Sequence, residues 1–584
     1  MQLGLGHGMV PGARIQAKCK KFSSHQGMAL GGAIMNLVDM NIVDRRLKSI
    51  AEEMGIVLMK TSYSTIFNEG RDFTCGVADD SCELVASADF QPAQVGGMPL
   101  VVASIIKEIP LSEMDEGDVI IHNDPFRGGM HTPEHTLIKP IFFEGEFFGF
   151  SVAIGHIAEV GGMVPGGFPG EATEVYQEGL RVPPVKIQEK GKDVEPVWKI
   201  MLANHRTPRQ NHGDIRALIS AVNRGESRII DLIREYGPNR YREICNDLKD
   251  YAERRMRAEI TSIPDGIYSF EDYMEDDGVT DQAYKIAVDL YVSQDKIVAD
   301  FSRTDDQSPG PINAVLSVAW SATYNAILHL TDPQIPRNSG AFRPIKIVAP
   351  PGKLVNADFP AAEVGGNTET HIRICHTVVG ALAKAIPERA FAPDGGTHSN
   401  FLFGATDERT GNYAVCYDFT GAGWGGRPVA DGHNASNCVN GNSRMNPVEV
   451  FETRFPWRFE SFGLIPGSGG DGEYRGGLGM NKVLTCLSDN MEVSFMSDRQ
   501  NIAPWGIQGG GKGQNGSVLI RRRSSQDFVT ACEDSNKTSA SKFNRIGFRK
   551  GDQISISSPG GGGYGDPKYR SVERRAKDQD EGWV

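Results

Sequence analysis

The placement of glycine is the feature that most constrains how this chain can fold. The 584 residues include 68 glycines, and many of them stand in pairs or runs. These are Gly128-Gly129, Gly161-Gly162, Gly365-Gly366, Gly469-Gly470, Gly476-Gly477 and Gly560 to Gly563. Adjacent glycines indicate tight turns or places where two backbones approach closely. Their spacing is not periodic, which disfavours a solenoid of repeats.

The chain is too long for a single hydrophobic core, so several domains are expected. Helix and strand patterns do not alternate regularly, which favours a multidomain α+β protein with mixed sheets, flanking helices and a glycine-rich β C-terminal region. The expected segments are an N-terminal extension (1–37), an α+β domain (38–265), a β-rich segment with one helix (266–355), a helix with glycine-rich loops (356–450), a β-rich C-terminal region (451–566) and a charged, mobile tail (567–584).

Hydrophobic periodicity indicates the individual elements. It predicts helices over 42–59, 100–109, 214–236, 239–263, 317–330 and 370–386. It predicts strands over 73–85, 118–122, 141–154, 268–273, 284–292, 296–301 and 344–349. Glu144-Gly145 is the expected hairpin turn within 141–154.

Charge and cysteine content exclude several classes of protein. The net charge of −13 disfavours nucleic acid as a partner, because phosphate binding needs clustered Lys and Arg. Nine scattered cysteines without a CxxC pair are typical of a reducing cytosol. The sequence has no run of 18 apolar residues and no signal-peptide pattern at its start. A cytoplasmic protein without a membrane span is therefore expected.

The loop HNDPFRGGMHTPEHTLIKP (122–140) concentrates polar groups that suit chemistry. His131 and Glu134 are close enough in sequence to chelate one ion, and a returning hairpin could add His156. Two histidines and one carboxylate leave positions open for water or substrate, as in catalytic zinc, manganese or iron sites. The competing interpretation is a polar turn. For Asp124, which begins an Asp-Pro turn, backbone capping is an equal alternative.

Other polar residues are assigned structural roles. His122 and His135 are expected to pack or to form hydrogen bonds, and Cys375-His376 lies in an apolar helical pattern where the two side chains face different sides. Turn and cap roles are the default for polar residues beside glycine turns or element ends. These are Asp72, Asn367 and Glu369.

Two glycine motifs do not form nucleotide sites. GAGWGG (421–426) follows a strand pattern, but no helix follows it, and a phosphate site needs a helix N-terminus. GGGKGQNGS (509–517) lacks the Lys-Ser/Thr pair of a P-loop. The sequence therefore shows no nucleotide site.

Eight motifs together resemble one known family. In order they are EEMGIVLMKTSYS, EGRDFTCGVAD, GDVIIHNDPFRGGMHTPEHT, GHIAEVGGMVPG, TEVYQEGLRVPPVKI, GGNTET, SGGDGEYRGGLG and PGGGGYGDP. The chain from about Val38 to Pro567 is similar to the hydantoinase B/oxoprolinase family, the B-type subunits of ATP-dependent amidohydrolases and ketone carboxylases. The N-terminal extension is outside the resemblance.

The resemblance implies a site and a division of labour. In the acetone carboxylase branch a His-x-x-Asp pair and a later histidine bind a metal, and these positions fall on His131, Glu134 and His156, with Glu in place of Asp. The implied metal is zinc or manganese. Asp124 or Asp72 would orient water or act as general base.

The resemblance also implies a hetero-oligomer. A partner A-type subunit of the hydantoinase A family, with an actin/hexokinase-like fold, would bind ATP-Mg and phosphorylate the carbonyl oxygen of the substrate. The B-type chain would then open the ring of a cyclic amide such as a hydantoin, a lactam or 5-oxoproline. The alternatives are the matching subunit of an acetone- or acetophenone-type carboxylase and a scaffold subunit without catalytic activity.

Overall fold

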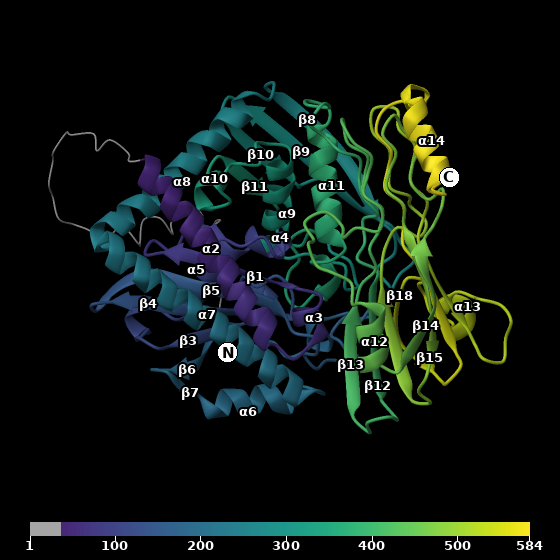
Figure 1. Cartoon of the computed structure of the whole chain (residues 1–584), viewed down its shortest axis with the longest axis horizontal. Coiled ribbons are helices and arrows are strands. Elements are labelled where there is room, and N and C mark those ends of the chain that lie inside the picture. Colours follow the sequence, from purple (N-terminus) through teal and green to yellow (C-terminus); the bar gives the residue numbers. More distant parts are fainter. Residues whose placement is uncertain (1–36) are drawn as a thin grey trace, which may run out of the picture.

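The computed structural model describes residues 37–584, which form four β-sheets with helices packed on them (Figure 1). This arrangement confirms the predicted α+β class with mixed sheets. The predicted N-terminal extension (1–37) lies outside the described residues except for Leu37, where the first described helix begins. Within residues 37–584, none of the helices combines the length and apolar character that a bilayer span requires.

The first sheet has seven antiparallel strands in the order β2-β1-β5-β4-β3-β6-β7. Its strands are β1 (Phe73–Asp79), β2 (Leu84–Ser87), β3 (Val119–His122), β4 (Glu134–Phe143), β5 (Glu146–His156), β6 (Val185–Glu189) and β7 (Lys192–Asp193). The predicted strands over 73–85 and 118–122 are thereby confirmed. The predicted strand pair over 141–154 is also confirmed, but β4 begins seven residues earlier than the pattern indicated (Glu134 against Ile141).

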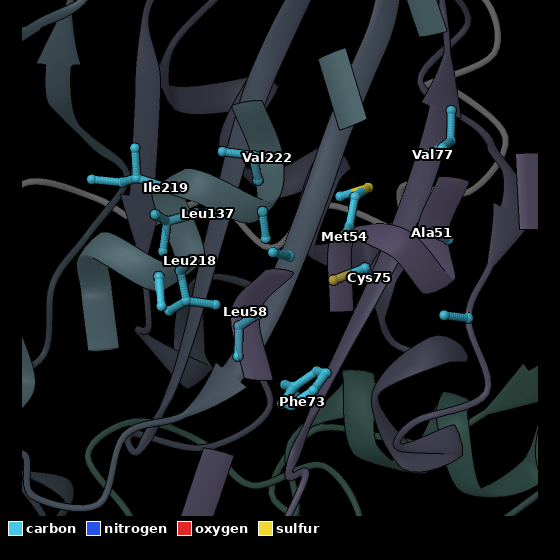
Figure 2. Packing of buried hydrophobic residues seen from close by; sticks show 14 of the residues in the cluster. Ala51, Met54, Leu58, Phe73, Cys75, Val77, Leu137, Leu218, Ile219 and Val222 are labelled. Carbon is cyan, nitrogen blue, oxygen red and sulfur yellow. The ribbon is translucent and has the colours of Figure 1, made fainter. Parts of the chain in front are cut away.

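Helices cover this sheet on both faces. The long helices α2 (Leu37–Thr61) and α7 (Pro208–Tyr236) pack on each other and on the central strands, and Figure 2 shows α2 side chains beside those of β1 and α7 side chains beside Leu137 of β4. Met54, Leu58, Leu218, Val222 and Phe73 are fully buried there. The other helices of this part are α3 (Thr65–Asn68), α4 (Pro92–Val95), α5 (Met98–Glu108), α6 (Glu195–Ala203) and α8 (Pro238–Thr261).

The second sheet has the order β11-β10-β9-β8 and shares a core with helices from both sides of position 356. Its elements are β8 (Gly266–Met274), β9 (Tyr284–Ser293), β10 (Lys296–Asp300), α9 (Leu316–His329), α10 (Ser339–Phe342), β11 (Ile345–Val348) and α11 (Thr370–Leu382). Helix α11 packs on α9, β8 and β9. The expected segments 266–355 and 356–450 are therefore joined by one hydrophobic core.

Two further four-stranded sheets form the C-terminal part, in the orders β13-β12-β16-β18 and β14-β15-β19-β17. Their elements are β12 (Asn400–Thr406), β13 (Tyr413–Asp418), α12 (Val448–Arg454), β14 (Trp457–Leu464), β15 (Met480–Cys486), β16 (Met491–Met496), β17 (Ser517–Arg521), α13 (Ala531–Ser535), β18 (Lys542–Phe548) and β19 (Gln553–Ser557). Aromatic side chains dominate the core between the sheets, with Phe401, Phe403 and Trp457 fully buried.

The glycine run Gly560 to Gly563 is a site of close backbone approach and not a turn. The Gly561 amide donates to the Gly477 carbonyl, and its carbonyl accepts from the Gly470 amide. The Gly562 amide donates to the Pro393 carbonyl, and its carbonyl accepts from the Gly426 amide. A Cβ atom on Gly561 would lie 2.1 Å from the Trp424 carbonyl oxygen, so the packing permits only glycine. Gly161 and Gly162, with φ of 81° and 78°, are turn glycines of the expected kind.

A buried ion-pair cluster joins the second sheet to the C-terminal part. Arg373 contacts Asp498 at 2.8 Å, and Arg499 contacts Asp272 at 2.7 Å. Lys542 lies 3.3 Å from the second oxygen of Asp498. Burial alone would raise the pKa of Asp272, but the guanidinium groups of Arg499 and Arg373 outweigh it and hold this pKa at about 2. We call these five residues the ion-pair cluster.

The C-terminal residues 567–584 are not the mobile tail that their charge suggested. They contain helix α14 (Val572–Asp580), which Ser571 caps by accepting from the Arg574 amide. Asp578 is buried and paired with Arg475 and Arg570. The prediction was wrong because the buried Asp578 of this helix is paired with Arg475, 103 positions earlier in the sequence, and with the nearby Arg570.

Candidate functional site

The predicted hairpin places Glu134 and His156 directly opposite each other. The turn residues Glu144 and Gly145 both have positive φ, as a two-residue hairpin turn of type I′ requires. A β-bulge between Ile141 and Phe142 shifts the register of the turn by one residue, and the shifted register pairs Glu134, at the start of β4, with His156, at the end of β5. The side chains of an opposed pair point to the same face of a sheet and lie close together.

His131 joins this pair from the loop before β4. Its Nδ1 lies 3.3 Å from Oε2 of Glu134, and its ring centroid is 5.2 Å from that of His156. The three side chains are almost completely buried. Burial and the neighbouring His131 ring hold the pKa of His156 well below its ordinary value. The imidazole is therefore neutral, which is the form that binds metals.

Asp72 lies on the other side of His156, just before β1. Its backbone carbonyl accepts from the His156 amide at 3.0 Å, and its carboxylate lies 3.9 Å from Nδ1 of His156. The Gln91 amide donates to the carboxylate at 3.2 Å. Burial, reinforced by the nearby Glu134 carboxylate, raises the pKa of Asp72 to about 7. Asp72 is thus poised to take or give a proton near neutral pH.

These four side chains line one small cavity, which we call the hairpin pocket. Its volume is about 20 Å³, enough for one water-sized group but not for an organic ring. Gln91, Asn367, Thr368, His398 and Tyr417 complete its wall, together with Ala93, Phe419 and Ser443. The hairpin pocket therefore combines three histidines, two carboxyl groups and side-chain amides around space for a single small species.

The donor atoms of the hairpin pocket suit a divalent cation. Among the described residues, Nε2 of His131, Nε2 of His156 and Oε2 of Glu134 are buried without a hydrogen-bond partner. Buried polar atoms without partners are rare and costly, and a cation would satisfy all three. Within residues 37–584, however, no three His, Cys, Asp or Glu side chains already stand at metal-ligand spacing, so a bound cation would draw these groups closer.

Asp124, the other predicted catalytic residue, does not lie in the hairpin pocket. Its Oδ1 accepts from the Phe126 amide and caps a single 3-10 turn at 125–127, and its Oδ2 is 3.0 Å from Arg181. The catalytic assignment is therefore not supported by the geometry. The alternative of backbone capping describes what the side chain does, because the Asp-Pro turn fixes it locally.

The histidines that were assigned to packing are buried and neutral. Burial lowers the pKa of His122 and of His135 to about 4. Nδ1 of His135 lies 3.2 Å from the Pro133 carbonyl oxygen, on the face of β4 opposite to Glu134. Cys375 and His376 are both buried in α11 and do not line the hairpin pocket.

Several residues of the hairpin pocket were not identified as functional from the sequence. The Asn367 amide lies 2.9 Å from Nδ1 of His131 and donates to Oε1 of Glu134 at 3.1 Å. Gln94 donates to the same oxygen at 2.9 Å. The ring of Tyr417 stacks on His156 with centroids 4.6 Å apart. Asn367 belongs to GGNTET, one of the motifs that carry the family resemblance, but its position beside a glycine turn predicted only a structural role.

A pair of buried carboxyl groups supports the loop behind His131. Glu178 accepts from the amides of Glu363 and Val364, and Glu363 accepts from the Thr132 amide. Burial raises the pKa of Glu178 to about 8, and burial together with the Glu178 carboxylate holds the pKa of Glu363 well above its ordinary value. The two groups therefore hold a proton at neutral pH. They connect Thr132, next to His131, with the segment that leads to Asn367.

Known relatives cover nearly the whole chain. The caprolactamase subunit beta of Pseudomonas jessenii is 30% identical over 559 residues, which are 94% of this chain and 95% of that protein. The 5-oxoprolinase of Dictyostelium discoideum is 30% identical over 530 residues, which are 90% of this chain but 40% of that longer protein.

Solved structures show the same fold. The crystal structure of the ATP-dependent caprolactamase from Pseudomonas jessenii superposes with a TM-score of 0.86 at 27% identity, covering 94% of this chain and 95% of that one. Acetone carboxylase shares the fold with a TM-score of 0.86 at 17% identity, covering 94% of this chain and 78% of that one. The profile of the hydantoinase B/oxoprolinase family matches residues 36–567, and the chain belongs to this family.

Proposed function

We propose that this chain is the B-type subunit of an ATP-dependent cyclic-amide hydrolase and that the hairpin pocket is its hydrolytic site. The observation that carries the proposal is the convergence of His131, Glu134, His156 and Asp72 on one buried cavity. The relatives in sequence favour hydrolysis, because a caprolactamase and a 5-oxoprolinase are each 30% identical to this chain. The acetone carboxylase, at 17% identity, supports the fold alone.

The residues of the hairpin pocket have separate roles in this proposal. His131, Glu134 and His156 would hold a divalent cation, zinc or manganese, which supplies Lewis acidity and lowers the pKa of water when it is bound. Asn367 and Gln94 hold the Glu134 carboxylate through Oε1 and leave Oε2 free. Neutral His156 is fixed by its backbone bond to Asp72 and by the Tyr417 ring.

Asp72 would handle the proton. In the proposed reaction a water molecule adds to the ring carbon, which a partner A-type subunit has made electrophilic by transferring phosphate from ATP-Mg to the carbonyl oxygen. The ionised Asp72 accepts the proton of this water, and the protonated group then returns it to the ring nitrogen. The C–N bond breaks to leave an acyl phosphate, which a second water molecule hydrolyses to the carboxylate and free phosphate. A pKa of about 7 suits both directions of transfer.

The complex of this chain with its A-type partner provides the test. We expect cyclic amides to stimulate ATP hydrolysis and to be opened without bicarbonate, and we expect the purified complex to contain stoichiometric metal. His131→Ala should remove both the metal and ring opening, whereas His212→Ala, on helix α7 outside the pocket, should change neither. A requirement for bicarbonate would contradict hydrolysis. Full activity of His131→Ala without bound metal would leave only a scaffold role.

A further inference from the structure

The hairpin pocket is too small for the molecule that it is proposed to act on. Its volume of about 20 Å³ accommodates one water-sized group. Pockets that bind small organic ligands usually have volumes of about 300–1,000 Å³. The ring of a cyclic amide must therefore be held in a neighbouring space, with only its reacting carbon reaching the histidines.

A second cavity of suitable size lies next to the hairpin pocket. Its volume is about 300 Å³, and it shares the residue Tyr417 with the hairpin pocket. Ala158, two residues beyond His156 in the chain, also lines it. We call it the Tyr417 cavity. Strand β13 supplies one wall, and the first turn of α7, with Gln210, lies in another.

The lining of the Tyr417 cavity combines aromatic surface with neutral polar groups and one cationic side chain, Arg454, which donates to the Tyr63 carbonyl. Tyr63 and Tyr413 stand at its rim, where both are about half exposed (54% and 42%), so the cavity opens to solvent. Gln210 and Asn412 provide amide donors and acceptors. Asp407 is neutralised by a two-pronged contact with Arg409. These groups match a small neutral ring that carries its own N–H and C=O groups.

Tyr417 is the wall between the two spaces. Its ring stacks on His156 and Phe168, and its hydroxyl donates to Oδ1 of Asn400 at 2.8 Å. Rotation of this one side chain would break that hydrogen bond and both ring stacks, including the one that holds His156, and would open the cavity towards the hairpin pocket. Rotamer changes of this kind are common when ligands bind.

We propose that the Tyr417 cavity binds the ring of the cyclic-amide substrate and that Tyr417 separates it from the hairpin pocket until the ring is seated. This proposal rests on the proposed function for the identity of the ligand. It assigns substrate affinity and ring-size preference to residues that take no part in the proton transfer. Filling the cavity should therefore change KM and leave the chemical step intact.

The test substitutes Gln210→Trp, which fills the cavity from helix α7, and uses Arg209→Trp as the matched control. Arg209 is the preceding, exposed residue and does not line the cavity. With the A/B complex, Gln210→Trp should raise KM by at least about tenfold for a seven-membered lactam and by less for five-membered hydantoin, with kcat within about twofold. Arg209→Trp should match the native complex. Unchanged KM values in folded Gln210→Trp would overturn the proposal.

A binding measurement separates this proposal from the proposed function. Saturation-transfer NMR on the complex, with hydantoin and caprolactam as ligands, needs no turnover. Binding to the native complex that Gln210→Trp loses and Arg209→Trp keeps would support the cavity even if neither compound were hydrolysed. Absence of binding to the native complex, or equal binding to all three proteins, would overturn the cavity whatever the assay of hydrolysis shows.

Discussion

The hairpin pocket and the ion-pair cluster are both buried groups of ionisable side chains, but the pKa values of their carboxyl groups are shifted in opposite directions. In the ion-pair cluster each carboxylate faces a cation, and the pKa of Asp272 falls to about 2. In the hairpin pocket the carboxyl groups face histidines and amides, and the pKa of Asp72 rises to about 7. Burial is the same in both places, so the difference lies in the partners alone.

This difference separates a structural role from a chemical one. A carboxylate that is fully paired with guanidinium groups stays ionised and does not exchange protons near neutral pH. A carboxyl group with a pKa near neutrality, beside donor atoms without partners, remains able to bind a cation or move a proton. Burial and a high density of charged residues therefore do not identify the site. The uncompensated groups identify it.

The largest expected effect comes from breaking the ion-pair cluster. Arg373→Met removes the cation that faces both Asp498 and Asp272 and leaves each of these buried carboxylates with one cation, Lys542 and Arg499 respectively. We expect a loss of about 3–5 kcal/mol in the free energy of unfolding, measured by chemical denaturation. Arg545→Met is the control, because its pair with Glu492 is exposed and should contribute about 0–1 kcal/mol. Equal effects of the two substitutions would refute the contrast.

The second prediction concerns a substitution that should raise the free energy of unfolding while it lowers activity. Asp72→Asn keeps the acceptor for Gln91 but removes a carboxyl group that the fold holds at an unfavourable pKa. We expect kcat to fall by about 10²–10⁴. At pH 8 we expect the free energy of unfolding to rise, measured by the same denaturation. Destabilisation by Asp72→Asn would show that the carboxylate is compensated in the folded protein.

The pH dependence sharpens this prediction. The unfolded chain releases the Asp72 proton near its ordinary pKa of 3.8, while the folded chain keeps it until about pH 7. Between these values the folded state binds more protons, so its stability falls as pH rises, by at most about 1.4 kcal/mol per unit. For Asp272 the folded pKa lies below 3.8, so its contribution is full above about pH 4 and is lost towards pH 2. Asp72→Asn should remove only the first dependence.

Local patterns were sufficient to predict much of the fold around the site. The hairpin turn at Glu144-Gly145 and the helices on either side of Gly237 follow from residues near each other in the chain. The roles of the glycine runs were harder to predict, because the sequence does not distinguish a tight turn from a close approach of two backbones. Gly161 forms a turn, whereas Gly561 packs against the backbone of distant segments.

The other parts of the site could not be predicted because they depend on contacts across the whole chain. Asn367 meets His131 from 236 positions away. Tyr417 belongs to a different sheet from His156, and nothing in its own neighbourhood indicates that it stacks there. Asp124 shows the converse case. Its loop supplies His131 and Glu134 to the hairpin pocket, but the local Asp-Pro turn already uses its carboxylate.

A smaller effect is expected where the hairpin pocket holds Glu134 in place. Asn367→Ala removes the amide that contacts both His131 and Glu134 but leaves the proposed ligands intact. Loss of such a supporting contact typically weakens metal binding by about 10–100-fold, which competition with a chelator would measure. Asn446→Ala is the control, because it removes a buried amide that bonds Asp418 instead. If both variants bound the metal equally well, Asn367 would not support these ligands.

The smallest effect is expected at the carboxyl pair behind His131. Glu363→Gln replaces a protonated carboxyl group with an amide of the same shape and keeps an acceptor for the Thr132 amide, so kcat should stay within about threefold of the native value. Glu363→Ala leaves the Thr132 amide without its acceptor and Glu178 without its partner. It should lower kcat by about tenfold or more, since a buried unpaired group costs about 1–3 kcal/mol. Equal damage by Gln and Ala would mean that a second carboxyl group, and not a hydrogen-bonded pair, is what the loop requires.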